Sequence, residues 1–107
     1  MEQPNLLYID DLAGNDSMFK QKLIQVIKEE LPEEIKIYLE NYDKGEFVKA
    51  AQNVHKLKHK ISILGLTKGY AMANEFEHNL KNNIPPNNLH EEFKTLLEVM
   101  DDFIARQ

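Results

Sequence analysis

The sequence predicts an all-α fold, and three observations lead to that expectation. Apolar residues recur every three or four positions along nearly the whole chain, and no segment alternates cleanly as a β-strand would. The linkers between these segments are short, which makes consecutive helices antiparallel neighbours. A chain of 107 residues with 42% hydrophobic residues suffices for one modest core. We therefore expect an up-and-down antiparallel four-helix bundle with a short extra N-terminal helix, with residues 1–107 forming a single domain.

The N-terminal half can be divided by its periodicity and its turn residues. Residues 6–12 could form a short helix or an extended lead-in. Asp16 is suited to be an N-cap, because its carboxylate can accept a backbone N–H of the first helical turn. The apolar stripe that follows continues on both sides of Pro32, so we expect one bent, continuous helix rather than two. An exposed acidic face is expected around this proline, formed by Glu29, Glu30, Glu33 and Glu34.

Three further helices are expected, over residues 46–64, over residues 68–81 and from about residue 89 onward. A turn at residues 43–45 precedes the first of them, and Gly65 lies close to its C-terminal end. Thr67 is suited to cap the next helix. Residues 82–88, which are rich in asparagine and proline, are the clearest loop in the chain.

Composition narrows the class of protein. The formal net charge is −5, whereas nucleic-acid-binding domains ordinarily carry a basic face, so no nucleic-acid partner is expected. The chain has no cysteine, which excludes disulfides, thiolate zinc sites and cysteine nucleophiles. Neither a signal peptide nor an apolar run of the roughly 20 residues that span a bilayer is visible. We expect a free-standing, monomeric, cytoplasmic protein that has no membrane partner.

The helix expected over residues 46–64 carries the most distinctive residues. At ~100° per residue, one apolar stripe is formed by Phe47, Ala50, Val54, Leu57, Ile61 and Leu64. His55 lies ~130° from the middle of that stripe, so its imidazole should be at least partly exposed. The positions that share its face are a small apolar platform and a cationic rim, made of Val48, Ala51, Lys58, His59 and Ser62.

The surroundings of His55 suit a visiting anion, and a phosphoryl group fits best. In a chain that is acidic overall, positive charge gathers near this histidine on Lys49, Lys56, Lys60 and Lys68. A neutral imidazole nitrogen is a competent nucleophile, and Lys58, one turn away, is placed to stabilise a phosphorylated ring. Attack through one ring nitrogen is favoured when the other donates its proton to an acceptor. Glu77 on the next helix is the candidate acceptor.

The stretch from His55 to Gly65 resembles the signature of histidine phosphotransfer (HPt) domains of two-component phosphorelays. That signature reads roughly histidine, any residue, leucine or isoleucine, lysine, glycine, four variable residues, a hydrophobic residue and glycine. The matching residues here are His55, Leu57, Lys58, Leu64 and Gly65. The turn at residues 43–47 and the Phe76-Glu77 pair extend the resemblance to about residues 6–104, although only the central motif is specific. Where the family usually has glycine after the lysine, this chain has His59.

The resemblance implies a four-helix bundle with a short extra N-terminal helix. It also implies a phosphoryl-transfer reaction. His55 would accept a phosphoryl group on Nε2 from a receiver-domain aspartate and pass it to another receiver domain. Lys58 would stabilise phosphohistidine, and Glu77 would orient the ring. The implied partners are response-regulator receiver domains and a hybrid histidine kinase. The Mg²⁺ ion would be bound by the receiver domain, so this chain itself would need no cofactor or metal. The expected receiver-docking residues are Val48, Ala51, Lys56, His59 and Ser62.

Other interpretations stay open on the residues alone. A bundle that only binds or sequesters a receiver domain, without transfer, is suggested by His59 and Lys60. His55 and His59 also lie at a metal-chelating i,i+4 spacing, although the nearby lysines disfavour a cation. A nucleotide-dependent kinase is disfavoured because the chain has no glycine-rich phosphate loop. Lys56 and Lys60 are otherwise expected to be solvated charges.

Overall fold

The computed structural model describes residues 2–84 and 88–107, and the regular secondary structure in these ranges is entirely α-helical. The helices are α1 (Leu7–Ala13), α2 (Ser17–Asp43), α3 (Phe47–Ile63), α4 (Thr67–Lys81) and α5 (Leu89–Ala105). They form an elongated body of 45 × 24 × 19 Å. The predicted all-α class is therefore confirmed.

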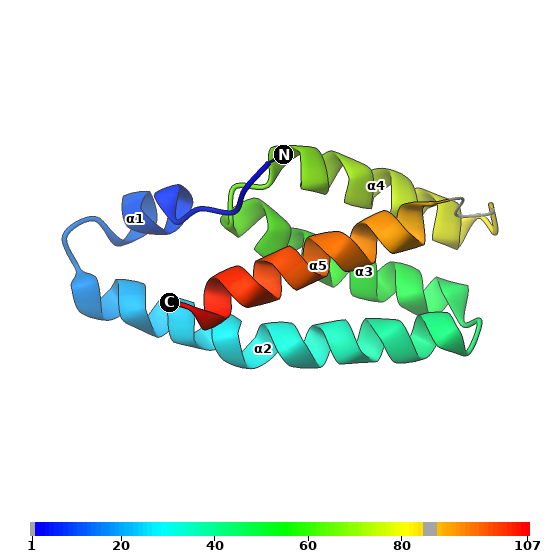
Figure 1. Cartoon of the computed structure of the whole chain (residues 1–107), viewed down its shortest axis with the longest axis horizontal. Helices are drawn as coiled ribbons and strands as arrows, with labels where there is room; N and C mark the ends of the chain where they lie inside the picture. The colour runs from blue at the N-terminus through cyan, green and yellow to red at the C-terminus, as the bar shows by residue number, and fades with distance from the viewer. Residues whose placement is uncertain (1, 85–87) are drawn as a thin grey trace.

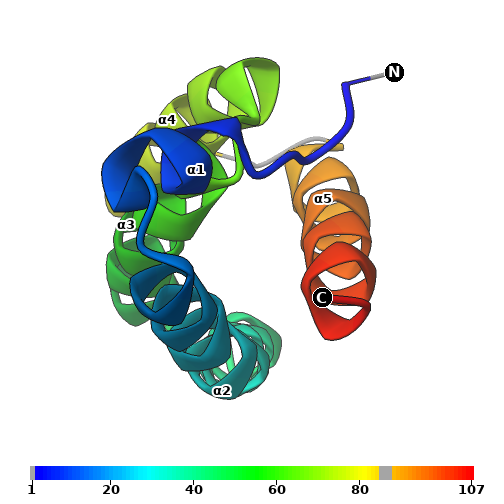
Figure 2. The same ribbon diagram turned by 90° about the vertical axis from the view of Figure 1, so that its left-hand side faces the viewer.

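The longer helices run alternately in opposite directions along the long axis (Figure 1). α3 packs against both α2 and α4, and α5 packs against the same two helices. The end-on view in Figure 2 shows them around a shared interior, with α1 at one end of the molecule. Large, fully buried side chains from all five helices fill this interior, including Ile9, Leu31, Tyr38, Leu57, Ile61, Phe76, Phe93 and Met100.

Several local signals are confirmed in the N-terminal half. The first segment is helical rather than extended. Oδ1 of Asp16 accepts the backbone N–H of Phe19 at 2.9 Å, as expected for an N-cap. α2 continues through Pro32 without interruption, so the expectation of one helix rather than two is correct. The predicted loop at residues 82–88 agrees with the end of α4 and the start of α5, but residues 85–87 lie outside the described ranges.

The predicted cap at the start of α4 is wrong. Leu66 occupies the N-cap position, and no side chain of the cap residue bonds the helix. Glu2 supplies the acceptor instead, with its carboxylate oxygens 2.8 Å from the backbone nitrogen of Lys68 and 3.0 Å from that of Gly69. Desolvation raises the pKa of Glu2, but these backbone hydrogen bonds outweigh it, so the pKa is lowered from its ordinary value. The N-terminal segment is thereby attached to the start of α4.

Gly65 shows why the turn between α3 and α4 needs glycine. Its φ is +76°, a conformation that is costly for residues with a Cβ. A Cβ at this position would also meet the side-chain amide of Asn5, at 2.6 Å from Nδ2. The backbone N–H of Asn5 donates to the carbonyl of Leu64 at 2.9 Å, so the N-terminal segment passes directly over this turn.

The expected acidic face of α2 is wrong at Glu34, which is buried. Nζ of Lys60 lies 3.0 and 3.1 Å from the two carboxylate oxygens of Glu34, and 3.0 Å from Oε1 of Glu30. Lys60 was expected to be solvated but is only 8% exposed, because the flank of α3 on which it lies is covered by α2. Desolvation lowers the pKa of Lys60, but the hydrogen bonds to the two glutamates outweigh it and raise that pKa.

Candidate functional site

His55 lies on an exposed ridge of α3. At 100° per residue, Val48, Gln52, His55, His59 and Ser62 fall within an arc of about 80° around the axis of α3, and all five are exposed. We call these residues the outer ridge. The side chain of His55 is 59% exposed, which confirms the exposure inferred from the helical geometry. Gln52 was not among the expected docking residues, although the same geometry places it on the ridge.

The expected platform residue Ala51 is not on the surface. Its side chain is fully buried, so its assignment to an exposed docking surface is wrong. Ala51 and Lys58 are two turns apart on α3 and therefore share a flank. Lys58 contacts residues of α4, so this flank is the one that α4 covers. Val48 stays exposed because it lies on the other side of His55 around the helix axis.

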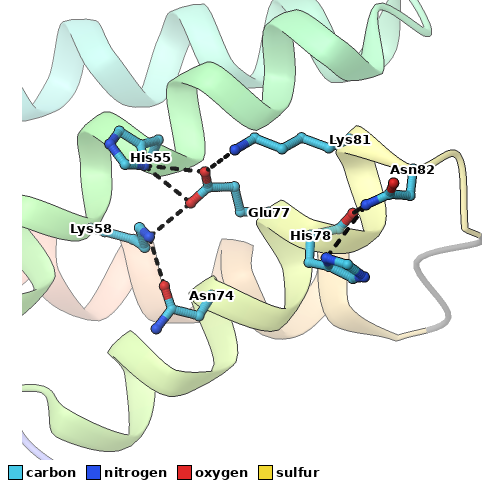
Figure 3. Close-up of polar contacts among 7 residues, drawn as sticks. All are labelled: His55, Lys58, Asn74, Glu77, His78, Lys81 and Asn82. Atoms are coloured by element: carbon cyan, nitrogen blue, oxygen red, sulfur yellow. Dashed lines mark hydrogen bonds and ion pairs between the residues drawn. The ribbon is translucent and has the colours of Figure 1, made fainter.

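Glu77 of α4 holds the ring of His55. Nδ1 of His55 lies 3.1 Å from Oε2 and 3.3 Å from Oε1 of Glu77, and the Glu77 side chain is only 7% exposed (Figure 3). An ionised carboxylate accepts hydrogen bonds but donates none, so Nδ1 carries the proton in this contact. The neutral ring then has its lone pair on Nε2, the nitrogen on the far side of the ring. The predicted acceptor is thus within hydrogen-bonding distance of the predicted nucleophile.

Two lysines keep Glu77 ionised. Nζ of Lys58 lies 2.8 Å from Oε1, and Nζ of Lys81 lies 2.9 Å from Oε2. Burial raises the pKa of Glu77, but the hydrogen bonds from Lys58, Lys81 and His55 outweigh it and lower that pKa to about 2. One carboxylate and two ammonium groups leave a net charge of +1 beside the His55 ring. Lys81 was missed from sequence, although its i,i+4 spacing from Glu77 on one helix was a visible signal.

Lys58 is less exposed than was expected for a residue on a cationic rim. Its side chain is 11% exposed, and Nζ donates to Oδ1 of Asn74 at 2.6 Å besides its contact with Glu77. The ammonium group also lies 5.4 Å from the ring centroid of Tyr70. Two of its three N–H donors are therefore committed to residues of α4. Asn74 was not identified from sequence, because nothing local distinguishes it from any other exposed asparagine.

The remaining expected docking residues lie on the exposed side of α3. His59 is one turn after His55, with ring centroids 5.7 Å apart and planes at 70° in an edge-to-face arrangement. Lys56 is 68% exposed, with Nζ 3.7 Å from Oε2 of Glu34. Ser62 is exposed on the outer ridge. The structure thus brings Val48, Lys56, His59 and Ser62 onto one accessible surface around His55.

Other kinds of site have little support in the geometry. In residues 2–84 and 88–107, His, Asp and Glu side chains form no cluster of three or more that could hold a metal ion. None of the helices described has both the length and the apolar character needed to cross a bilayer. No protein-family model, curated protein or solved structure matches this chain. The function therefore has to be inferred from the arrangement around His55.

Proposed function

We propose that this protein is a histidine phosphotransfer carrier of a two-component phosphorelay. His55 accepts a phosphoryl group from the aspartate of one receiver domain and passes it to another. In this proposal the longer helices form an up-and-down four-helix bundle of the HPt type, with α1 as the extra helix. The protein has no nucleotide-dependent kinase activity and works in the cytoplasm. The observation that carries the proposal is the exposed His55 ring, held through Nδ1 by the buried carboxylate of Glu77.

The hydrogen bond to Glu77 prepares the ring for in-line transfer. The lone pair of Nε2 attacks the phosphorus of an aspartyl phosphate, and an N–P bond forms as the acyl O–P bond breaks. The electron pair of the broken bond goes to the aspartate carboxylate. The proton on Nδ1 stays in its hydrogen bond to Glu77, so no base has to remove it. The positive charge that develops on the ring faces the ionised carboxylate, which stabilises it.

The charges around the ring stabilise a phosphoryl group on His55 only moderately, so that the group can both bind and leave. A phosphoryl group on Nε2 brings negative charge to a site where Lys58, Lys81 and Glu77 sum to +1. The attraction is moderate because Glu77 offsets one of the two lysines. A carrier needs this balance, since it has to release the phosphoryl group to the next acceptor. The Mg²⁺ ion expected on the partner receiver domain would supply the remaining charge neutralisation.

The outer ridge offers the partner an accessible surface. Val48 is exposed two turns before His55, and His59 and Ser62 are exposed after it. Lys56 beside the ridge adds an exposed positive charge that suits the acidic phosphorylation site of a receiver domain. We propose that response-regulator receiver domains and the receiver of a hybrid histidine kinase bind here in turn.

One of the two residues that suggested a bundle that only sequesters a receiver domain no longer supports that alternative. It rested on His59 and Lys60, and Lys60 is buried against Glu34 rather than available to a partner. His59 remains exposed next to His55, so transfer and sequestration have to be separated by measurement. They differ in whether phosphate becomes bonded to the protein.

The test is phosphotransfer profiling against the phosphorylated receiver domains of the source organism. We expect acid-labile, base-stable phosphate to appear on the protein, and His55→Gln to abolish it. His78→Gln is the matched control, since His78 is an exposed histidine of α4 whose side chain contacts Asn82 instead (Figure 3). Receiver binding without phosphate uptake would support sequestration, and uptake by the His55→Gln variant would refute transfer through His55.

A further inference from the structure

The phosphoryl group of the proposed reaction needs a hydrogen-bond donor that the buried lysine does not readily supply. Lys58 has two of its N–H groups directed at Glu77 and Asn74, away from the outer ridge. Lys81 is directed at the other carboxylate oxygen of Glu77 (Figure 3). Both lysines contribute charge at a distance, but turning toward Nε2 would break their contacts with a buried carboxylate. Breaking such contacts costs more than a surface ion pair returns.

His59 is a side chain beside the ring that is not committed in this way. It is exposed on the outer ridge one turn beyond His55, and the two rings meet edge to face with centroids 5.7 Å apart. No hydrogen bond or ion pair within residues 2–84 and 88–107 involves its ring nitrogens, whereas Nδ1 of His55 is held by Glu77. An imidazole carries at least one N–H in both its neutral and its charged form. His59 therefore has a donor to offer at any pH near neutrality.

We propose that His59 donates a hydrogen bond to the phosphoryl group on His55 and thereby slows its loss to water. This inference rests on the proposed phosphorylation of His55 and adds a positioning role for its neighbour. A phosphoryl group on Nε2 extends outward from the ridge, and its oxygens come within reach of a side chain one turn along the same helix. The donor fixes the orientation of the P–N bond and occupies one direction from which water would approach the phosphorus.

The proposal gives different expectations for three replacements of His59. Gln keeps a side-chain N–H donor, Leu keeps bulk but has no donor, and Gly has neither. Leu and Gln are good helix formers, so these two variants leave α3 intact even where Gly weakens it. His78→Leu is the matched control on α4, because His78 contacts Asn82 rather than His55.

The experiment uses phosphoramidate, a small phosphoryl donor that reacts with histidine and needs no partner protein. Each variant is phosphorylated, the phosphate is assigned to His55 by peptide mass spectrometry, and its decay is followed by ³¹P NMR. One lost hydrogen bond predicts that His59→Leu and His59→Gly lose phosphate about three to ten times faster than the wild type. His59→Gln is expected to lie close to the wild type, and His78→Leu to match it.

Results other than these would contradict either the hydrogen bond proposed for His59 or the phosphorylation proposed for His55. If His59→Leu decays like the wild type, His59 is not the donor. If only His59→Gly decays faster, the ring acts as a steric cover and the hydrogen-bond proposal is wrong. If phosphoramidate labels other histidines but never His55, both the inference and the proposed function fail. If His59→Leu still accepts phosphate from receiver domains and loses it at the wild-type rate, the role of His59 is wrong but the proposed function stands.

Discussion

Glu77 holds Nδ1 of His55 at 3.1 Å, which joins a buried carboxylate of α4 to an exposed ring of α3. The contact fixes the ring through Nδ1 and leaves Nε2 directed away from the carboxylate. It depends on the packing of α3 against α4, since the two residues are 22 positions apart in the sequence. A change in the register between these helices would separate the proposed nucleophile, His55, from the carboxylate proposed to orient it.

Replacing Glu77 with Gln tests the orienting contact. The amide keeps the shape of the side chain but removes the charge, and its NH₂ group can turn the His55 ring to the wrong tautomer. Loss of a charge-assisted hydrogen bond predicts that transfer to His55 slows by about tenfold or more. Rates of transfer from a phosphorylated receiver domain measure this. Glu75→Gln, at an exposed position of the same helix, is the control, and equal rates in both variants would contradict the role of Glu77.

The low pKa of Glu77 predicts how stability depends on acid pH. Its pKa is lowered from the ordinary 4.5 to about 2, so the unfolded state binds more protons between these values. The contribution of Glu77 is fully present above pH 4.5 and is lost as the pH falls toward 2. Urea unfolding followed by circular dichroism should show stability rising with pH in this window. In Glu77→Gln that slope should fall by up to about one proton, and an unchanged slope would refute the assignment.

The buried ion pair of Lys60 predicts a large effect from a single replacement. Lys60→Met removes the buried partner of Glu34 and leaves its carboxylate with the exposed ammonium of Lys56 at 3.7 Å, which is expected to lower the free energy of unfolding by about 3–5 kcal/mol. The double variant Lys60→Met/Glu34→Leu should recover much of that loss. Lys56→Met, at a site that is 68% exposed, should change stability by less than about 1 kcal/mol. Similar losses in the two single variants would count against a buried pair.

His90 predicts a second pH effect in a higher window. Its ring stacks on Tyr42 at 3.5 Å between centroids, and Nδ1 lies 2.6 Å from the hydroxyl of Tyr38. Burial and the charge of Lys94 lower the pKa of His90, although Glu91 and Asp43 act in the opposite direction. The unfolded state therefore binds the proton first, and stability is lost as the pH falls below 6.5.

The measurement for His90 compares urea midpoints between pH 5 and 8. His90→Gln keeps a group that can bond the Tyr38 hydroxyl but does not titrate, so it should remove part of the pH dependence in this range. His78→Gln, at an exposed site, is expected to leave the profile unchanged. A His90→Gln profile parallel to that of the wild type would show that His90 does not contribute.

Comparing alanine substitutions at Gly65 and Gly45 distinguishes the cost of backbone strain from the cost of a steric clash. Both have positive φ, +76° and +73°, so Ala at either position should cost about 1–2 kcal/mol in conformational strain. Only at Gly65 does a Cβ also meet the side chain of Asn5, whereas Gly45 faces open space. Gly65→Ala should therefore destabilise the protein more than Gly45→Ala in thermal unfolding. Adding Asn5→Ala to Gly65→Ala should recover part of the difference, and equal losses at the two glycines would contradict the packing explanation.

By itself the sequence determined the helices and the side of α3 that faces water. Periods of three and four residues reflect the geometry of one helix, so the all-α class, the N-cap at Asp16 and the exposure of His55 could be predicted. The i,i+4 spacing of Glu77 and Lys81 was also readable, although it was missed. These features depend on residues within a few positions of one another.

The tertiary structure alone decided which flanks of α3 are covered. Periodicity says how far a residue lies from the apolar stripe, but it does not say how widely the neighbouring helices bury that stripe. Ala51 and Lys58 are covered by α4, and Lys60 is covered by α2, so three expected surface positions became interior ones. Burial then required carboxylate partners for the two lysines. Those partners, Glu77 and Glu34, lie 19 and 26 positions away in the chain and are brought close only by helix packing.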